Sequence, residues 1–271
     1  MYERSDYGYE LPERLIAQQP IADRQQSRLL HLDRGADVLG HHLFSHLPGL
    51  LQEGDLLVVN NTAVVPGRLF GRKPTGGKVE ILILDAHAST SDPDAKRLHQ
   101  CMVRASKRVR PGMHLVFDDR LSAEVITAAD GIATLSFDCD SDFDVLLNEI
   151  GQVPLPPYIH RQRGSEPADR HRYQTVYASR KGAIAAPTAG LHFTPALMDE
   201  LRAGGIDIAQ VTLHVGYGTF VPVRVRDIRE HKMHAEWYEL TDRTAALINA
   251  AKAAGRRVVA VGTTSVRTLE A

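Results

Sequence analysis

Two short stretches between Ala186 and Phe220 carry the residue types that a small-ligand site needs. They are Ala186–Thr194 (APTAGLHFT) and Leu213–Phe220 (LHVGYGTF). Each places one histidine among small residues, a threonine and a phenylalanine. Glycine lets the backbone approach a ligand closely, histidine exchanges a proton near neutral pH, and phenylalanine offers a face for a flat ring. The alternative is two structural turns, each with a hydrogen-bonded histidine. Two such stretches so close together favour a pocket for a small, partly aromatic ligand.

A third stretch, His231–Glu236 (HKMHAE), admits three interpretations. As a helix it would place His231 and His234 on one face, but a metal site needs about three or four converging ligands. As a strand, which Trp237–Leu240 favours, it would place His234 beside Glu236, and a carboxylate next to an imidazole suits proton transfer. The third interpretation is two polar residues on a solvated strand face.

A candidate anion site lies at Gly262–Ser265, which follows an expected buried strand at Arg257–Val261 and opens into an expected helix. Free N–H groups at a helix start attract a carboxylate or phosphate, and hydroxyl groups add donors. The alternative is plain N-capping by threonine or serine. By contrast, Gly71–Lys78 does not fit a phosphate-binding loop, because Val79 stands where serine or threonine is needed. We expect a hairpin turn there.

Two groups of basic residues are candidates for RNA binding. The first is the arginine-rich run His160–Lys181, which is interleaved with tyrosines, and the second lies between residues 104 and 110. Phosphate contacts supply much of the affinity for nucleic acid, and aromatic rings stack on unpaired bases. The alternative for both groups is a solvated charged loop. The candidate contacts are Arg161, Arg163 and Arg172 in the first group and Arg104, Lys107, Arg108 and Arg110 in the second.

The elements that must position these residues indicate an α/β main domain with an inserted small antiparallel β-barrel domain. Asp55–Val59 is typical of a buried central strand. From Gly67 onward, short β-rich runs alternate with turn signals, and the proline-rich residues 153–158 form an extended linker. We expect residues 1–66 and 151–271 to form the two parts of the α/β domain and residues 67–150 the barrel.

The composition excludes several classes of protein. A chain of 271 residues with 43% hydrophobic and 24% charged residues is ordinary for a globular protein. A net charge of −1 gives no global signal for nucleic acid. The two cysteines, Cys101 and Cys139, lie far apart, which fits a reducing compartment. Because we find no signal peptide and no apolar run near the ~20 residues of a membrane helix, we expect a cytoplasmic protein that does not bind membranes.

Taken in order, these stretches resemble those of the S-adenosylmethionine:tRNA ribosyltransferase-isomerases, a family of queuosine biosynthesis. The resemblance spans nearly the whole chain and begins with the segment from Leu11 to Leu30. It rests further on Asp55–Phe70, Thr75–Glu80, Ala186–Thr194, Leu213–Val223, His231–Glu236 and Val261–Glu270. Family sequences continue past that last stretch with an Asn-Phe-His-Leu-Pro segment, so we expect this chain to lack the C-terminal segment of the family.

The resemblance implies a monomeric enzyme that uses S-adenosylmethionine as cosubstrate. Its other substrate is a tRNA whose anticodon loop carries 7-aminomethyl-7-deazaguanine at the wobble position. The enzyme transfers and isomerises the ribosyl unit onto the aminomethyl group, which gives epoxyqueuosine-tRNA, adenine and methionine. The resemblance implies no metal and no redox cofactor.

This chemistry needs acid–base groups, a site for the methionine carboxylate and an aromatic face for adenine. The resemblance implies that the acid–base groups are His192, His214, His234 and Glu236, with Phe193, Tyr217 or Phe220 stacking on adenine. It implies a cosubstrate site formed by Thr188, Gly190, Phe193, Gly216, Tyr217, Gly218, Thr219, Phe220, Gly262, Thr263, Thr264, Ser265 and Arg267.

Two alternatives stay open from the sequence. One is a catalytically impaired, tRNA-binding fragment of the same family. The other is a metallohydrolase built on His231, His234 and Glu236.

Overall fold

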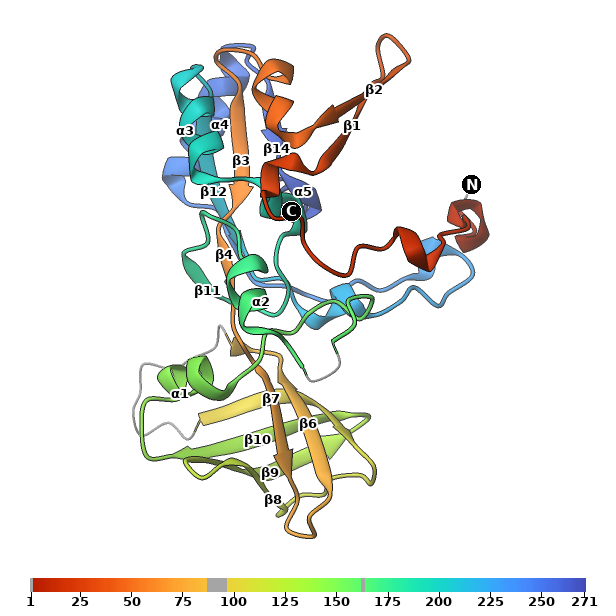
Figure 1. Ribbon diagram of the computed structural model, residues 1–271, viewed down its shortest axis with the longest axis vertical. Coiled ribbons are helices and arrows are strands. Elements are labelled where there is room, and N and C mark those ends of the chain that lie inside the picture. Colours follow the sequence, from red (N-terminus) through yellow and green to blue (C-terminus); the bar gives the residue numbers. More distant parts are fainter. Residues whose placement is uncertain (1, 87–96, 162–163) are drawn as a thin grey trace.

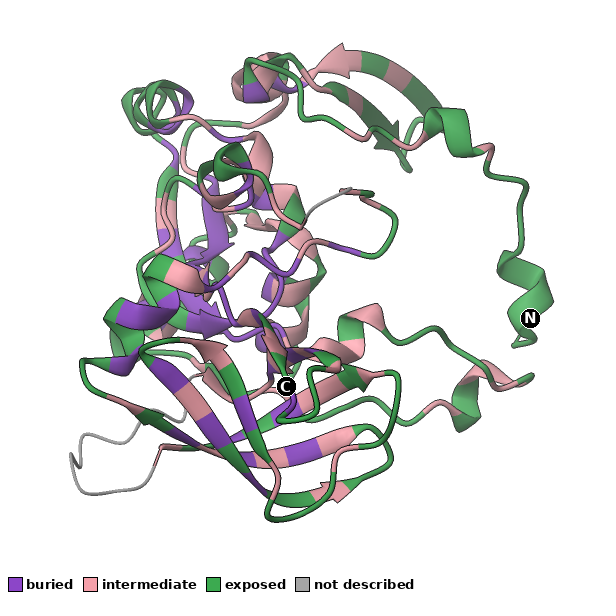
Figure 2. Cartoon of the chain, turned by 60° about the horizontal axis from the view of Figure 1, so that its bottom comes forward, coloured by how far each residue is buried: buried purple, intermediate pink, exposed green. Residues whose placement is uncertain are grey.

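The protein has a β-barrel at one end and an α/β sheet at the other (Figure 1). The structure is a computed structural model and describes residues 2–86, 97–161 and 164–271. Figure 2 shows that buried residues concentrate in the α/β sheet and alternate with exposed ones along the barrel strands. This distribution gives each part its own hydrophobic core.

The barrel is closed and antiparallel, with the strand order β10-β7-β6-β5-β8-β9, which confirms the expected insertion. Side chains alternate between its inside and outside, so Val79, Ile81 and Ile83 are buried in the interior. Residues 71–78 form the β5–β6 hairpin with Gly76 at φ +80°, as expected, and not a phosphate loop. The strands are β5 (Arg68–Arg72), β6 (Lys78–Ile83), β7 (Arg97–Ala105), β8 (His114–Asp118), β9 (Leu121–Ala129) and β10 (Ile132–Cys139).

Helix α1 (Phe143–Ile150) closes the barrel, because its buried Phe143, Leu146 and Leu147 belong to the same core as the barrel interior. Asp142 caps this helix by accepting a hydrogen bond from the backbone N–H of Val145. The described barrel strands and α1 thus all lie between residues 68 and 150.

The α/β part is built on a four-stranded sheet with the order β13-β12-β3-β14. Strands β12 (Asp207–Leu213) and β14 (Val258–Ala260) run parallel to β3 (Leu56–Asn60), and β13 (Tyr238–Glu239) runs antiparallel to β12. Every residue of β3 is buried, which confirms it as a central strand. The sequence predicts a buried strand at Arg257–Val261, but β14 is shorter and half-buried because it lies at the sheet edge.

Helices cover both faces of this sheet. On one face, α3 (Pro195–Ala203) and the 3-10 helix Phe44–Leu50 pack on Leu57 and Val59 of β3. On the other face, α4 (Asp242–Ala253) and the end of α5 (Gly262–Leu269) pack on Leu56 and Val58 of the same strand. Thr194 caps α3, as expected from the sequence. Among the described residues, no helix is long and apolar enough to span a membrane.

Smaller elements lie outside the barrel and the four-stranded sheet. A hairpin of β1 (Arg28–Asp33) and β2 (Val38–Leu43), which the sequence did not indicate, extends from the α/β part (Figure 1). The remaining pieces are the parallel pair β4 (Thr62–Val64) and β11 (Arg180–Ala183), helix α2 (Pro167–Arg172), and short 3-10 helices at Arg4–Tyr7, Glu13–Leu15, Arg24–Gln26, Thr188–His192, Tyr217–Phe220 and Ile228–Glu230.

Phe193 belongs to the hydrophobic core and not to a ligand site. Only 1% of it is exposed, and its ring packs edge-on against Phe44 with the centroids 4.9 Å apart. The sequence-based assignment of Phe193 to adenine stacking is therefore corrected, since a ring enclosed by protein offers no face to a ligand.

Replacing this ring tests its structural role. We expect Phe193→Ala to lower the free energy of unfolding by about 3–5 kcal/mol, because it leaves a cavity in the core. Phe220→Ala should cost less than half as much, because Phe220 is only half-buried. Urea unfolding followed by circular dichroism measures both changes, and equal losses would contradict this placement.

Asp55 ties the start of β3 to the edge strand. Its buried carboxylate accepts hydrogen bonds from Arg257 Nε (2.8 Å) and from the backbone N–H of Gln52 (2.8 Å). The Arg257 hydrogen bond lowers the pKa of Asp55, against the opposing effect of burial. The charged carboxylate therefore stabilises the fold at pH values above the unfolded pKa of about 3.9, and this contribution is lost as the pH falls through the lower folded pKa.

A pH series tests this contribution. At neutral pH we expect Asp55→Asn to lower the free energy of unfolding by about 1–3 kcal/mol, the range for a lost partner of a buried charged group. The difference from wild type should stay constant from pH 5 to 8 and shrink below about pH 4. The control, Asp199→Asn on the surface of α3, should stay within about 0.5 kcal/mol throughout. A difference that does not change with pH would argue against this role.

Candidate active site

A buried polar network joins the carboxyl ends of the two central strands. The side chain of Asn60 donates to the carbonyl oxygen of Leu213 (3.0 Å) and accepts from the backbone N–H groups of Leu213 (3.1 Å) and Thr62 (3.1 Å). A buried amide that lacks partners costs about 1–3 kcal/mol, so these bonds hold the chain to one path as it leaves β3 and β12.

The same network anchors His214, the histidine of the stretch Leu213–Phe220. Thr212 Oγ1 donates to Asn61 Oδ1 (2.7 Å), and Thr62 Oγ1 lies 2.8 Å from Nδ1 of His214. The His214 ring is buried and stacks on Trp237, with centroids 4.9 Å apart and planes at 18°. These contacts hold the His214 ring at the carboxyl edge of the sheet.

Glu236 fixes the chain that follows β12. One of its carboxylate oxygens accepts from the backbone N–H of Gly216 (2.7 Å), and the other pairs with Arg267 on α5. Arg267 also donates to the carbonyl oxygen of His234 (2.8 Å). The Glu236 side chain is only 8% exposed, and a buried carboxylate needs such partners to stay charged. The pair therefore links α5 to both the Gly216 loop and the segment before β13.

The contacts of Glu236 and Arg267 change two assignments that the sequence predicts. Arg267 already pairs with a carboxylate, so the structure does not offer it freely to a ligand anion. Residues 231–236 form no strand, so His234 and Glu236 do not act as a face-sharing pair. Instead the exposed His234 ring packs against Tyr217, with centroids 4.9 Å apart, and a Cβ at Gly218 would come within 2.7 Å of that imidazole.

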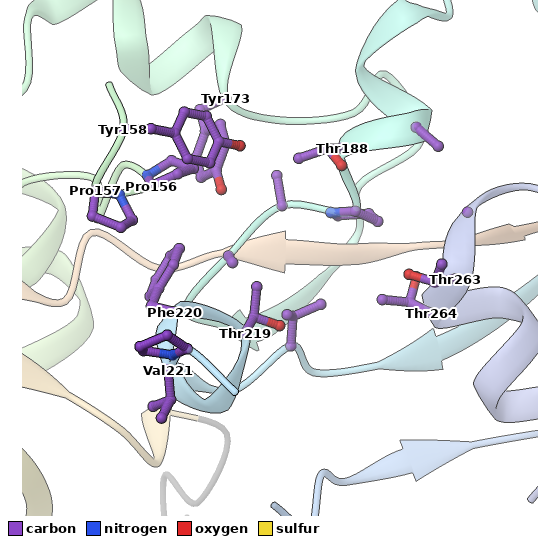
Figure 3. Close-up of a pocket in the computed structure, with 17 residues that line it drawn as sticks. Pro156, Pro157, Tyr158, Tyr173, Thr188, Thr219, Phe220, Val221, Thr263 and Thr264 are labelled. Atoms are coloured by element: carbon purple, nitrogen blue, oxygen red, sulfur yellow. The ribbon is translucent and has the colours of Figure 1, made fainter. Parts of the chain in front are cut away.

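Three stretches singled out from the sequence converge on one cavity of about 550 Å³. Small-molecule sites usually have volumes of about 300–1,000 Å³. Figure 3 shows Thr188 on one side, Thr219 and Phe220 on another, and Thr263 and Thr264 at the start of α5. The walls are mainly apolar and carry several threonine hydroxyls, which is the usual composition of a site for a partly aromatic ligand. The lining comprises residues 156–158, Tyr173, residues 185–189, Val215, residues 219–222 and residues 262–264.

The first turn of α5 faces this cavity without a side-chain cap. Its N-cap residue is Val261, whose side chain cannot accept a hydrogen bond. Gly262 has φ +80°, a left-handed conformation that favours glycine, and a Cβ there would lie 3.3 Å from Ala189. Thr264 Oγ1 is buried and has no hydrogen-bond partner within the described part of the chain. Unpaired donors at a helix start form a site for a carboxylate or phosphate. The alternative of plain capping by threonine or serine is not what the structure shows.

Ser265 and Gly190 make their close contacts within the protein, away from the lining of the cavity. The buried Ser265 hydroxyl donates to the carbonyl oxygen of Val261 (2.9 Å) within α5. A Cβ at Gly190 would come within 2.1 Å of the Tyr177 hydroxyl, so glycine there permits a close approach inside the protein. Neither residue is among those that line the cavity.

The predicted acid–base residues do not line this cavity either. His192 is half-buried beside Phe44, and its Nδ1 lies 3.0 Å from Ser27 Oγ, while burial lowers its pKa. Neither it nor His214, His234 or Glu236 is among the described residues that line the cavity. The titratable side chains that do line it are Tyr158 and Tyr173, and burial raises the pKa of Tyr173.

Sequence reasoning missed the wall formed by residues 156–158 and Tyr173. The Pro-Pro-Tyr run was interpreted only as a domain linker. Its signal was present, however, because two prolines followed by a tyrosine form a rigid apolar surface that ends in a hydroxyl.

The basic residues of the first predicted RNA-binding group are largely engaged within the protein. The Arg161 side chain is 7% exposed and forms hydrogen bonds of 3.0 and 2.9 Å to Asp169, which argues against a phosphate contact. Arg172 donates to the carbonyl oxygens of Ile21 and Ala22. Arg163 lies outside the described residues. The second group differs, because Arg104, Lys107, Arg108 and Arg110 are all exposed on the barrel.

No group of three or more histidine, cysteine or acidic side chains is arranged to hold a metal ion among residues 2–86, 97–161 and 164–271. In particular, His231, His234 and Glu236 do not form such a group.

Comparison with known proteins places these features in a family. Residues 4–271 match the family model described as queuosine biosynthesis protein. The chain is 47% identical to the S-adenosylmethionine:tRNA ribosyltransferase-isomerase of Syntrophotalea carbinolica and 48% identical to that of Geobacter metallireducens, with 98% of this chain and 76% of each relative covered. A crystal structure of the S-adenosylmethionine tRNA ribosyltransferase from Thermotoga maritima is 32% identical over 97% of this chain and 71% of that one, with a TM-score of 0.43. The chain therefore belongs to the queuosine biosynthesis protein family.

Proposed function

We propose that this chain is an S-adenosylmethionine:tRNA ribosyltransferase-isomerase. In this reaction the ribosyl unit of S-adenosylmethionine passes to the aminomethyl group of 7-aminomethyl-7-deazaguanine in tRNA and is isomerised. The products are epoxyqueuosine-tRNA, adenine and methionine. The observation that carries this proposal is the convergence of residues 186–189, 219–222 and 262–264 on one cavity with a free helix start.

The cavity provides for each part of S-adenosylmethionine. The first turn of α5, with Thr263 and Thr264, offers donors to the methionine carboxylate. Phe220 and Tyr158 offer faces for adenine, and the Thr188 and Thr219 hydroxyls can bond the ribose. These groups would bind and orient the cosubstrate in the cavity.

The acid–base steps place further demands on the site. The sulfonium acidifies the neighbouring ribose carbon, so a base must take a proton there, and adenine needs an acid as it leaves. We propose that His214 and Glu236 act as positioning residues, because their contacts fix the loop that carries Thr219 and Phe220. Among the described residues that line this cavity, Tyr158 and Tyr173 carry the titratable side chains.

We propose that the anticodon loop of the tRNA docks on the barrel. Lys107 and Arg108 are exposed there, and Arg104 lies on the barrel face turned toward the linker at residues 154–157. This assigns the role to the second basic group, since Arg161 and Arg172 are committed to contacts within the chain.

The helix-start site can be tested with hydroxyl-free variants. Thr263→Val combined with Thr264→Val should weaken S-adenosylmethionine binding at least about tenfold, the loss for one hydrogen bond to a charged group. Affinity for tRNA should not change. Isothermal titration calorimetry measures both, and Thr127→Val, which removes a hydroxyl on the barrel, serves as the control. An unchanged cosubstrate affinity would remove the carboxylate assignment.

The RNA-docking proposal predicts a change in salt dependence. Lys107→Ala combined with Arg108→Ala should weaken tRNA binding and reduce the slope of log K against log salt by about 0.7–0.9 for each lost phosphate contact. Arg161→Ala should instead lower thermal stability, because it leaves the buried Asp169 without its partner. Filter binding over a salt series checks the first expectation. If Arg161→Ala alone flattens the slope in a fully folded protein, the docking surface lies on the other group.

A further inference from the structure

A second cavity of about 370 Å³ lies between the barrel and the proline-rich linker. On the barrel side it is lined by the outer face of β6 and its neighbouring strands, including Arg68, Glu80 and Arg104. On the other side it is lined by the linker and the loop after β12. Its volume suits one nucleotide-sized group and not a longer segment.

The two cavities share a wall. Pro156, Pro157, Phe220 and Val221 line both of them. The two cavities therefore adjoin at these four side chains. A reaction that transfers a group between two substrates must bring the reacting atoms to within about 3–3.5 Å, and adjoining cavities favour such an approach.

Glu80 is the acidic residue among the described lining of this cavity, and it faces basic neighbours. Inward-pointing Val79 and Ile81 flank it, so strand alternation turns Glu80 outward. It lies opposite Arg104 on β7, and its Oε1 is 2.8 Å from Nε of Arg68. The side chains of Arg68 and Glu80 remain 28% and 25% exposed, so the carboxylate keeps capacity to accept further hydrogen bonds.

We propose that this second cavity receives a single unpaired guanine-type base of the RNA substrate and that Glu80 determines its specificity, an inference that rests on the proposed function. Of the standard bases, guanine alone has two adjacent donors on its Watson–Crick edge, an N–H and an amino group. The two oxygens of a carboxylate match this pair. Arg68 holds the carboxylate in place and charged.

The remaining walls suit the rest of a nucleotide. Tyr217 and Phe220 offer aromatic faces of the kind on which unpaired bases stack. Arg104 offers a cation for a flanking phosphate, and it connects this cavity with the exposed Lys107 and Arg108 beyond it. A base held here would present its ribosyl-accepting side toward the shared wall of the first cavity.

The test compares anticodon stem-loop RNAs that differ only in the wobble base, guanosine or inosine, because inosine lacks the 2-amino donor. We expect the wild-type chain to prefer guanosine about tenfold, the ratio for one hydrogen bond to a charged group worth about 1.4 kcal/mol. Glu80→Gln should abolish the preference, because its amide directs a donor at a donor. Glu124→Gln, on an exposed position of β9, should retain it.

Fluorescence anisotropy measures the six affinities, those of three proteins for two RNAs, and thermal unfolding with S-adenosylmethionine binding confirms that each variant is folded. The role of Glu80 is overturned if wild type shows no preference for guanosine over inosine, or if Glu80→Gln leaves that preference unchanged. The contact between Glu80 and Arg68 would then be only a surface ion pair. Adenine release by wild type in the presence of S-adenosylmethionine and precursor tRNA is a separate readout. Its absence would overturn the proposed ribosyl transfer, whereas the base preference is decided by the binding data alone.

Discussion

The buried amide of Asn60 is the constraint on which the site depends. It lies at the carboxyl end of the central strand, where its polar atoms must be satisfied within the protein because water cannot reach them. They are satisfied by the backbone of Leu213 and Thr62, which commits the chain after β12 to a single exit from the sheet. His214, Val215 and the glycine-rich loop take their positions from that exit.

The cavity forms where elements of distant sequence meet at this edge. The Glu236–Arg267 pair connects α5 to the loop at Gly216, so the helix start and the loop cannot move independently. The conformation of Gly262 brings the first turn of α5 against Ala189. Rigid prolines of the linker complete the enclosure from the side of the barrel. The result is a mainly apolar first cavity with hydrogen-bond donors at one end. The second cavity adjoins it on the side of the barrel.

The two basic groups differ in their contacts. The described arginines between residues 160 and 181 bond atoms within the protein, whereas the basic residues between 104 and 110 are exposed. Arg161, Arg170 and Arg172 bond carbonyl or carboxylate oxygens that hold the linker and the N-terminal segment in place. Arg104, Lys107, Arg108 and Arg110 on the barrel are exposed instead, and Arg104 lines the second cavity. Burial decides the difference, since a guanidinium enclosed by protein must find partners there, whereas one in water need not.

Elements whose residue pattern is local can be predicted from the sequence. The barrel follows from alternating strands and turn residues, β3 from its apolar run, and the cap of α3 from Thr194 before Pro195. The sequence also identified the stretches that converge on the cavity and the family to which they belong. Which residues each side chain in those stretches contacts depends on the tertiary structure. Phe193 and Phe220 have similar local surroundings in sequence, yet one is enclosed by Phe44 and the other lines both cavities. Likewise Arg267 pairs with Glu236, and His192 lies against Ser27 from a distant segment. Such pairings depend on long-range packing, which the spacing of residues along the chain does not encode.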